Sequence, residues 1–287
     1  MIRLVASDMD GTLFDRPMHV PEETFDAIRQ LADVGIRFCA SSGRRSNELE
    51  ELFAPVYDEM DFVASNGAEV VIGGRRADWE IFPHDGLMQL ADVVNQFDIL
   101  HLLAHTDDLT YVMDDSESKY RRYPKRPDDR RRFVHARPDA ETHVYSGVII
   151  CEDPARVPDL VYALGVEMGD VFTFAWTGSR GIDYMPTYVS KANGIRKVMR
   201  HYGLAPDEVM AYGDSMNDYD ILRFVGHPVV MGNGLYGVRQ IAERVIGTNV
   251  EHAVQADMLR LAAERRAELA AAGASAGGLP AAGREGA

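Results

Sequence analysis

The feature that most constrains the fold of this chain is an alternation of strand-like and helix-like segments at its start. Residues 2–7 form a short apolar run, and residues 20–35 repeat apolar side chains at helical spacing. A second apolar run over 36–41 then leads into a loop and a helix over 42–53. Alternation of this kind predicts a parallel sheet covered by helices on both faces, with ligands bound at the carboxyl ends of the strands.

The later segments differ from this start and then return to it. Residues 62–82 carry Asn66-Gly67 and Gly73-Gly74 between short apolar runs, which is typical of hairpin turns. A less regular mixture of one helix and several β-rich runs follows, and the alternation resumes at residue 189. We therefore predict an α/β fold in which a Rossmann-like, doubly wound parallel sheet forms the core and an α+β domain is inserted into it.

Domain boundaries follow from these changes of pattern. The α/β core is expected to be discontinuous and to comprise residues 1–83 and 186–270, with the α+β domain inserted over 84–185. Residues 271–287 are small and Gly-rich, with almost no bulky apolar side chains, so we expect a disordered tail there.

Net charge and cysteine content narrow the class of protein. The formal charge of −15 disfavours nucleic acid as a partner, because binding to a phosphate backbone depends on Lys and Arg. Cys39 and Cys151 each lie among apolar neighbours, so we expect no disulfide and a reducing compartment. The chain has no membrane-length apolar stretch and no signal-like N-terminus. These observations predict a cytoplasmic protein that needs neither a membrane nor an obligate protein partner.

Two aspartates, Asp8 and Asp10, end the first apolar run. Residues two apart on an extended chain project to the same side, and Gly11 permits a sharp turn directly after them. On its own, such a pair is equally well explained as a turn with solvated carboxylates. A carboxylate held near apolar surroundings is costly, however, unless a positive charge or a proton compensates it.

Polar groups also follow the second strand and begin a later helix. Ser42 supplies a hydroxyl, and Gly43 with the following backbone amides forms a concavity suited to an anion. Lys191 follows Ser190, an expected N-cap, at a helix end where the dipole disfavours a cation, so a nearby anion is expected. Taken alone, the first segment is also explained as a capping loop, and the lysine as a solvated surface residue.

A second acidic strand end lies in the later part of the chain. Asp214 follows the apolar run 208–213, and Asn217 and Asp218 open the next helix, where a carboxylate favours the dipole. Capping alone explains Asp218 but not two acidic ends in separate strands of one sheet. The set of oxygen ligands fits Mg²⁺, which is usually bound by one or two carboxylates together with a substrate phosphate.

The joint pattern of these motifs resembles the haloacid dehalogenase (HAD) superfamily of phosphatases, in particular its Cof-type branch (subfamily IIB). The motifs DMDGTL, SSGR, SNGA, SKANGI, GDSMND and VVMGNG occur in the order typical of that family, between about residues 5 and 250. One departure is Ser42, where the family commonly has threonine, but the hydroxyl is retained. The resemblance implies that the domain over 84–185 is a cap of the C2 type, which closes over the active site.

The resemblance also implies a role for each acidic residue. Asp8 would be the nucleophile that forms an aspartyl-phosphate, and Asp10 would act as general acid and then general base. Mg²⁺ would be held by the Asp8 side chain, the Asp10 backbone carbonyl and Asp214. Asp218 would support nearby waters or these ligands without being one of the three metal ligands.

The remaining motif residues would contact the substrate. Ser42 and Lys191 would bind the oxygens of the transferring phosphoryl group and so belong to the catalytic set. Asn66 matches a position that faces the substrate, although it is equally well explained as a hairpin residue. The expected substrate-binding residues are Gly43, Arg44, Asn66 and Asn217.

The resulting expectation is a Mg²⁺-dependent phosphomonoester hydrolase that acts on a small phosphorylated metabolite, with sugar phosphates favoured by the resemblance. A phosphomutase and a non-catalytic phosphometabolite sensor remain as alternatives. A glycosyltransferase that uses a D-x-D pair leaves Lys191 and Asp214 unexplained. Residues 119–132 carry eight Lys and Arg against two Asp, and this segment either attracts an anionic substrate or is a solvated loop.

Overall fold

The computed structural model describes residues 1–123, 132–176 and 180–276. The chain divides into two compact units. Unit 1 comprises Met1–Ala40, Glu50–Asp61 and the chain from Met199 onward, and unit 2 comprises Ser41–Leu49 and Phe62–Val198. Most of the basic segment 119–132 lies outside the described residues.

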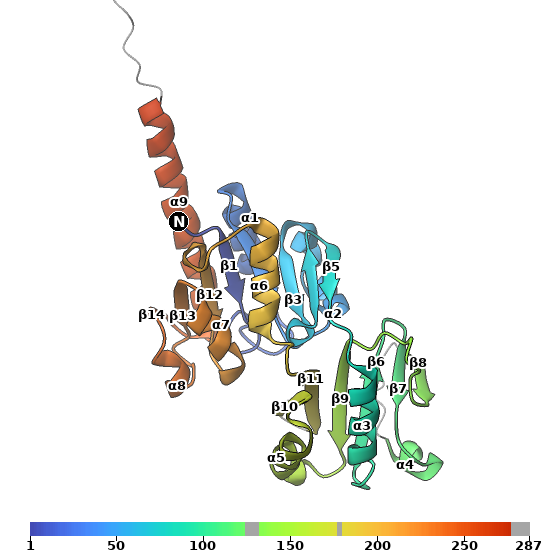
Figure 1. The fold of residues 1–287 in the computed structure, drawn as a ribbon. Helices are drawn as coiled ribbons and strands as arrows, with labels where there is room; N and C mark the ends of the chain where they lie inside the picture. The colour runs from blue at the N-terminus through green and yellow to red at the C-terminus, as the bar shows by residue number, and fades with distance from the viewer. Residues whose placement is uncertain (124–131, 177–179, 277–287) are drawn as a thin grey trace, which may run out of the picture. The chain divides into compact units, whose positions relative to one another are not determined.

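Eight strands form the first sheet (Figure 1). They are β1 (Leu4–Ser7), β2 (Arg37–Ser41), β3 (Asp61–Ala64), β4 (Glu69–Ile72), β5 (Arg75–Trp79), β12 (Val209–Gly213), β13 (His227–Val230) and β14 (Arg244–Val245). Their order is β14-β13-β12-β1-β2-β3-β4-β5. β1 pairs in parallel with β2 and β12, and β13 pairs in parallel with β12 and β14. β4 and β5 form the hairpin expected at Gly73-Gly74, where both residues have positive φ.

Strand β1 is the centre of unit 1, and all four of its residues are buried. Strand β2, next in sequence, lies on one side of it, and β12, more than 200 residues away, lies on the other. The strand order therefore reverses at β1, because later strands are added on its other side. Open α/β sheets bind their ligands at such a switch point, outside the carboxyl ends of the strands. Asp8 and Asp214 directly follow the two strands that meet there.

Four α-helices lie wholly within unit 1, in the part of the chain that the structure describes. They are α1 (Glu22–Asp33), α7 (Tyr219–Phe224), α8 (Tyr236–Arg239) and α9 (Ala253–Ala276). Helix α1 begins after Pro21 with two glutamates that favour the helix dipole, and it packs against α9. Gln255 of α9 is buried and donates from Nε2 to the Leu13 carbonyl and to Thr24 Oγ1, both at 2.9 Å. This contact ties α9 to the loop that follows Asp8.

Asp257 of α9 connects this helix to two strands of the sheet. Its carboxylate accepts hydrogen bonds from Tyr212 Oη of β12 at 2.7 Å and from Arg244 Nη1 of β14 at 2.9 Å, and also from Arg260 Nη2 at 2.8 Å. Burial by itself would raise the pKa of Asp257, but these three donors hold that pKa below its usual value.

Unit 2 contains a second, six-stranded sheet. Its strands are β6 (Leu100–His105), β7 (Leu109–Val112), β8 (Arg132–His135), β9 (Ser146–Cys151), β10 (Phe172–Trp176) and β11 (Gly181–Pro186), in the order β10-β11-β9-β6-β7-β8. Helices α3 (His84–Val94) and α5 (Val157–Met168) cover one face of this sheet (Figure 1), over a core that includes Leu102, Ile149 and Tyr184. On the other face, Leu103 and Val112 pack with Tyr123, which follows α4 (Glu117–Arg122).

Two further helices carry predicted site motifs. Helix α2 (Ser46–Leu52) follows the SSGR motif, and α6 (Lys191–Tyr202) begins at the predicted lysine. Ser190 Oγ accepts a hydrogen bond from the Asn193 amide at 3.1 Å, so the expected N-cap is confirmed. Gly203, the expected stop, has a φ of +63°.

The predicted fold class is confirmed: the chain is α/β with a parallel sheet, and a separate mixed sheet is built from residues 100–186. The prediction for the tail was partly wrong, because α9 continues to Ala276 and so includes residues 271–276. Alanine has the highest helix propensity, and these residues are mostly alanine. Residues 277–287 lie outside the described residues, and the expected domain boundaries stay a prediction.

Neither unit offers a candidate for a transmembrane segment: in the part of the chain that the structure describes, each helix is too short or too polar to cross a lipid bilayer.

We predict that Asp257→Ala destabilises the protein by about 3 kcal/mol, because it leaves Arg244 and Tyr212 without their shared acceptor. The control is Glu264→Ala, which removes only an exposed partner of Arg260 and should change stability by less than about 0.5 kcal/mol. Urea unfolding of both variants measures the difference. Equal effects of the two substitutions would contradict the anchoring role of Asp257.

Candidate active site

Asp8 continues the line of strand β1 and is buried, with 8% of its surface exposed. Its amide donates to the Tyr212 carbonyl at 3.0 Å, so the pairing with β12 extends one residue past the strand. Met9 is fully buried, and Asp10 beyond it is exposed. The buried Met9 side chain anchors the turn between the two aspartates, and both aspartates follow the carboxyl end of β1.

The turn after Asp10 brings the backbone against Asp214. Gly11 has a φ of +83°, and a Cβ built on it would lie 2.6 Å from Asp214 Oδ2. Thr12 Oγ1 donates to Asp214 Oδ1 at 3.0 Å, and Asn233 Nδ2 donates to the Gly11 carbonyl at 2.7 Å. Glycine is therefore required at position 11 for both conformation and space.

Thr12 and Asn233 hold this turn, and our sequence reasoning assigned no role to either. Both belong to motifs quoted above, DMDGTL and VVMGNG, and membership of these motifs is the sequence feature that could have identified them. Their partners lie 202 and 222 residues away along the chain, so local patterns do not identify them.

The carboxylates of Asp8, Asp214 and Asp218 form one cluster. One oxygen of each lies within 4.8 Å of the others. Asp218 is buried and accepts from the amides of Asp214 and Ser215 at 3.1 and 3.3 Å, as the N-terminus of a helix allows. Asn217 is exposed, and its Oδ1 accepts from Ser215 Oγ at 2.5 Å. The structure thus brings together three of the predicted acids.

The donor set of this cluster fits a hard divalent cation. Two carboxylates 4.8 Å apart repel each other by about 3 kcal/mol at an effective dielectric constant of about 20, so three at this separation favour a bound positive charge. All candidate ligands are oxygen atoms. Mg²⁺ and Ca²⁺ prefer oxygen ligands, whereas softer transition metals prefer nitrogen or sulfur ligands. The cluster can therefore hold a metal ion.

In unit 2, the SSGR loop is bound to the SNG turn (Ser65–Gly67). The Ser42 amide donates to the Val63 carbonyl at 2.8 Å, and the Ser42 carbonyl accepts from the Asn66 amide at 2.9 Å. Ser42 itself is buried, and its Oγ accepts from the Arg44 amide at 3.1 Å. The loop therefore has a fixed backbone on which the Ser42 hydroxyl retains its own proton to donate.

The SNG turn in turn touches the start of α6. Gly67 has a φ of +105°, and a Cβ on it would lie 2.0 Å from the Ser190 carbonyl oxygen. Lys191, the first residue of α6, is only 3% exposed. Since the turn contacts both Ser42 and Ser190, the predicted hydroxyl and the predicted lysine belong to one continuous cluster of loops in unit 2.

Asn66 has a left-handed conformation, with φ 54° and ψ 25°. Its side chain lies against Gly43, where a Cβ would be 3.1 Å from Asn66 Nδ2. The same Nδ2 donates to Asp183 Oδ2 of β11 at 3.5 Å. Burial raises the pKa of Asp183 to about 6, and the hydrogen bond from Asn66 offsets only part of that rise.

Each predicted residue is thus placed in one of two groups. Unit 1 holds Asp8, Asp10, Asp214, Asn217 and Asp218. Unit 2 holds Ser42, Gly43, Arg44, Asn66 and Lys191, together with Asp183, which our sequence reasoning missed.

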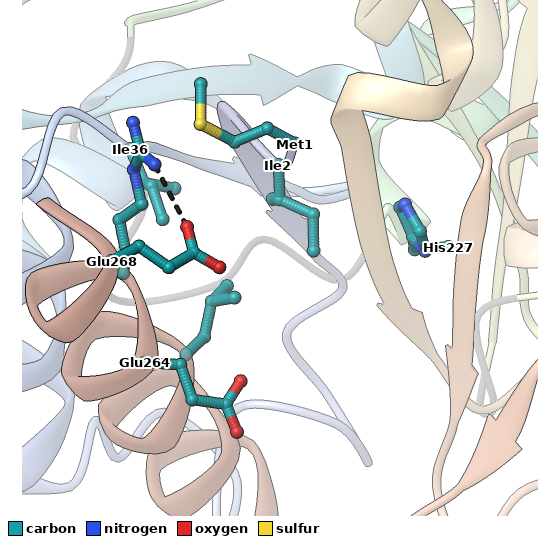
Figure 2. A pocket seen from close by; sticks show the side chains of 8 residues that line it. Met1, Ile2, Ile36, His227, Glu264 and Glu268 are labelled. Atoms are coloured by element: carbon teal, nitrogen blue, oxygen red, sulfur yellow. Dashed lines mark hydrogen bonds and ion pairs between the residues drawn. The ribbon is translucent and has the colours of Figure 1, made fainter. Parts of the chain in front are cut away.

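A hollow of about 330 Å³ in unit 1 is not part of this site. It is lined by residues that include Ile2, Ile36 and His227, which precede or begin parallel strands, and by the α9 residues Glu264 and Glu268 (Figure 2). It therefore lies at the amino ends of the strands, opposite the edge that carries Asp8 and Asp214.

Comparison with known proteins finds matches over most of the chain. The sequence model of the haloacid dehalogenase-like hydrolases matches residues 5–258. A 5-amino-6-(5-phospho-D-ribitylamino)uracil phosphatase of Escherichia coli, YbjI, is 27% identical over 249 residues, which cover 86% of this chain and 92% of that protein. YitU of Bacillus subtilis, a phosphatase of the same description, is 28% identical over 259 residues, which cover 88% and 94%.

A solved structure shows the same fold. The protein SMU.1108c from Streptococcus mutans superposes with a TM-score of 0.76 at 17% identity, over 92% of this chain and all of that one.

A doubly wound sheet with acids after its neighbouring strands β1 and β12 places a cluster that can hold a metal ion where α/β proteins bind their ligands. The chain belongs to the haloacid dehalogenase-like hydrolase family, in its Cof-type branch, and is an enzyme of the phosphatase class.

We predict that Asp183→Asn stabilises the protein at neutral pH. The pKa of Asp183 is about 6 when folded and near 4 when unfolded, so the folded state binds the proton more tightly and loses stability as pH rises through this window. Ionisation of Asp183 in the folded protein therefore lowers the free energy of unfolding by on the order of 2 kcal/mol above pH 6, and this loss is absent below pH 4.

Thermal unfolding of both proteins from pH 4.5 to 7.5 measures this effect. The asparagine variant should melt several degrees higher at pH 7, and the two melting temperatures should converge at the acidic end. A difference that stays constant with pH would contradict the raised pKa.

Proposed function

We propose that this protein is a Mg²⁺-dependent phosphomonoesterase that acts on a small phosphorylated metabolite, a sugar or polyol phosphate, through an aspartyl-phosphate intermediate. The observation that carries the proposal is the burial of Asp8 at the tip of β1, with a carboxylate oxygen within 4.8 Å of those of Asp214 and Asp218. The substrate class is supported by the two relatives described above, whose named substrate carries its phosphate on a ribityl chain.

In the first step, a carboxylate oxygen of Asp8 attacks phosphorus, and the bond from phosphorus to the ester oxygen breaks. Asp10 gives its proton to the departing oxygen, so the alcohol leaves neutral. In the second step, Asp10 takes a proton from a water molecule whose oxygen attacks phosphorus. The bond from phosphorus to Asp8 then breaks and inorganic phosphate leaves. The exposed position of Asp10, two residues beyond a buried nucleophile, suits exchange of this proton with solvent.

The Asp8 side chain, the Asp10 carbonyl and the Asp214 side chain would hold Mg²⁺, and Asp218 would support them. When bound, the ion would neutralise Asp8 toward the phosphoryl group and stabilise charge that develops on phosphoryl oxygens. Ser42 and Lys191 would bind the same oxygens from their loop cluster, aided by the backbone at Gly43 and by Arg44. We further propose that residues 84–185 act as the cap, and that Asn66 and Asn217 contact the substrate.

We expect Asp8→Asn to reduce kcat for hydrolysis of p-nitrophenyl phosphate by at least about 10³-fold, because an amide is a poor nucleophile. Removal of divalent ions with EDTA should abolish wild-type activity, and added Mg²⁺ should restore it. The matched control is Asp220→Asn, an exposed acid in the first turn of α7, which should leave kcat unchanged. Activity that survives either Asp8→Asn or EDTA would overturn the proposal.

A second test concerns the support of the metal site by Asp218. The Asp218→Asn substitution replaces an acceptor of two backbone amides and removes a negative charge, so the Mg²⁺ concentration for half-maximal activity should rise about 10- to 100-fold. The maximal rate at saturating Mg²⁺ should fall much less. A lowered rate with an unchanged Mg²⁺ requirement would assign Asp218 to another role.

A further inference from the structure

Asp183 lies on the face of the second sheet that α3 and α5 leave uncovered. Its neighbours Ile182 and Tyr184 are fully buried in the core beneath those helices. Because side chains alternate along a strand, Asp183 points to the opposite face. In the register of the sheet, Asp183 pairs with Val148 of β9, which packs on that same opposite face.

Ser146 joins Asp183 on this face. It lies two residues before Val148 on β9 and is therefore a diagonal neighbour of Asp183, at a Cα separation of about 7–8 Å. Among the residues that the structure describes, Ser146 Oγ is a buried hydroxyl that has no hydrogen-bond partner. Leaving a buried hydroxyl unsatisfied costs free energy, so a retained one indicates a ligand or an ordered water.

The polar row continues across the sheet. His105 of β6 lies directly opposite Ser146, and its Nδ1 is hydrogen-bonded with Thr110 Oγ1 of β7 at 3.1 Å. Apolar side chains, among them Leu103, Val112 and Tyr123, cover the neighbouring part of this face. His101, four residues before His105 on β6, lies on the same face and is hydrogen-bonded with Asp114 and Glu152. Asp183, Ser146 and His105 therefore form a separate polar group, at the end of the face that Asn66 contacts.

That end touches the loops that we assign to phosphoryl binding. Asn66 links them, since its side-chain Nδ2 donates to Asp183 Oδ2 and the same side chain lies against Gly43 of the SSGR loop. All of these residues belong to unit 2. A substrate whose phosphate is bound near Ser42 would therefore extend its leaving group toward Asp183 and Ser146.

We infer that Asp183, Ser146 and Asn66 form the part of the substrate site that binds the hydroxyl groups of a sugar or polyol leaving group. This inference rests on the proposed phosphatase function and deepens it. A carboxylate accepts hydrogen bonds from two hydroxyls, a serine both donates and accepts, and the Asn66 amide donates. Such a set rejects substrates without hydroxyls, because its buried polar groups then stay unpaired. The raised pKa of Asp183 still leaves it ionised at neutral pH, as an acceptor for hydroxyl donors.

The test compares two substrates with the same phosphoryl group. Ribitol 5-phosphate carries hydroxyls on its leaving group, and p-nitrophenyl phosphate carries none. For Asp183→Asn we expect kcat/KM to fall at least 10-fold for ribitol 5-phosphate, chiefly through KM, and to change less than 2-fold for p-nitrophenyl phosphate. Ser146→Ala should show the same selectivity with a smaller loss, and Asp159→Asn, an exposed acid on α5, should change neither.

Parallel losses for both substrates, or no loss for either, would overturn the inference. So would a wild-type enzyme that hydrolyses p-nitrophenyl phosphate but shows no preference for ribitol 5-phosphate, and in that case the proposed phosphatase function would stand. Absence of p-nitrophenyl phosphate hydrolysis in the wild type would instead count against the phosphatase function.

A binding measurement keeps the inference testable without turnover. Calorimetric titration of ribitol 5-phosphate into Asp8→Asn protein and into the Asp8→Asn, Asp183→Asn double variant should give affinities that differ at least 10-fold. Inorganic phosphate should bind both proteins equally. Equal affinities for ribitol 5-phosphate would overturn the inference.

Discussion

Repulsion among the carboxylates at the ends of β1 and β12 is the constraint on which the arrangement of unit 1 depends. The fold offsets part of it locally: Asp218 accepts two backbone amides, and Asp214 accepts Thr12 Oγ1. Hydrogen bonds to a charged group contribute about 1.5–3 kcal/mol each, which holds the acids in place but does not remove their charge. The backbone at Gly11 closes on Asp214 because no side chain intervenes. These contacts therefore hold the acids in position, and positioning of reacting groups supplies much of the catalysis in phosphoryl transfer.

The sequence was sufficient to predict the core because its signals are local. β1 and β12 are short apolar runs, each followed by an acid, and parallel strands bring such ends to one edge of the sheet. The second sheet was harder to predict. Strand β6 is buried along its whole length, so it lacks the polar alternation that marks a half-exposed strand, and it went unrecognised. Helix α5 was missed as well, because two exposed apolar residues, Tyr162 and Val166, blur its helical pattern.

The site residues, too, fall into those that the sequence predicts and those that it does not. Asp8, Asp214 and Lys191 follow recognisable strand or helix boundaries, so their positions could be predicted. Asp183 could not, because its role depends on a contact with Asn66, 117 residues away. The Asn66-Gly67 pair read as a hairpin turn or as a substrate contact, and its geometry allows both: the left-handed backbone makes the turn, and the side chain reaches β11. The Asn-Gly pattern predicts the turn, but it does not predict the side-chain contact with β11.

Stability and function therefore make opposite demands on the uncovered face of the second sheet. An apolar side chain at position 183 would avoid the cost of ionising a half-buried carboxylate, and one at position 146 would avoid an unsatisfied hydroxyl. Folding alone thus favours neither polar residue at these positions. Local departures from the most stable choice are expected where a site must bind a polar ligand. Both departures lie on one face, at the end nearest the Ser42 loop, and this coincidence is explained by a shared ligand rather than by two independent defects of packing.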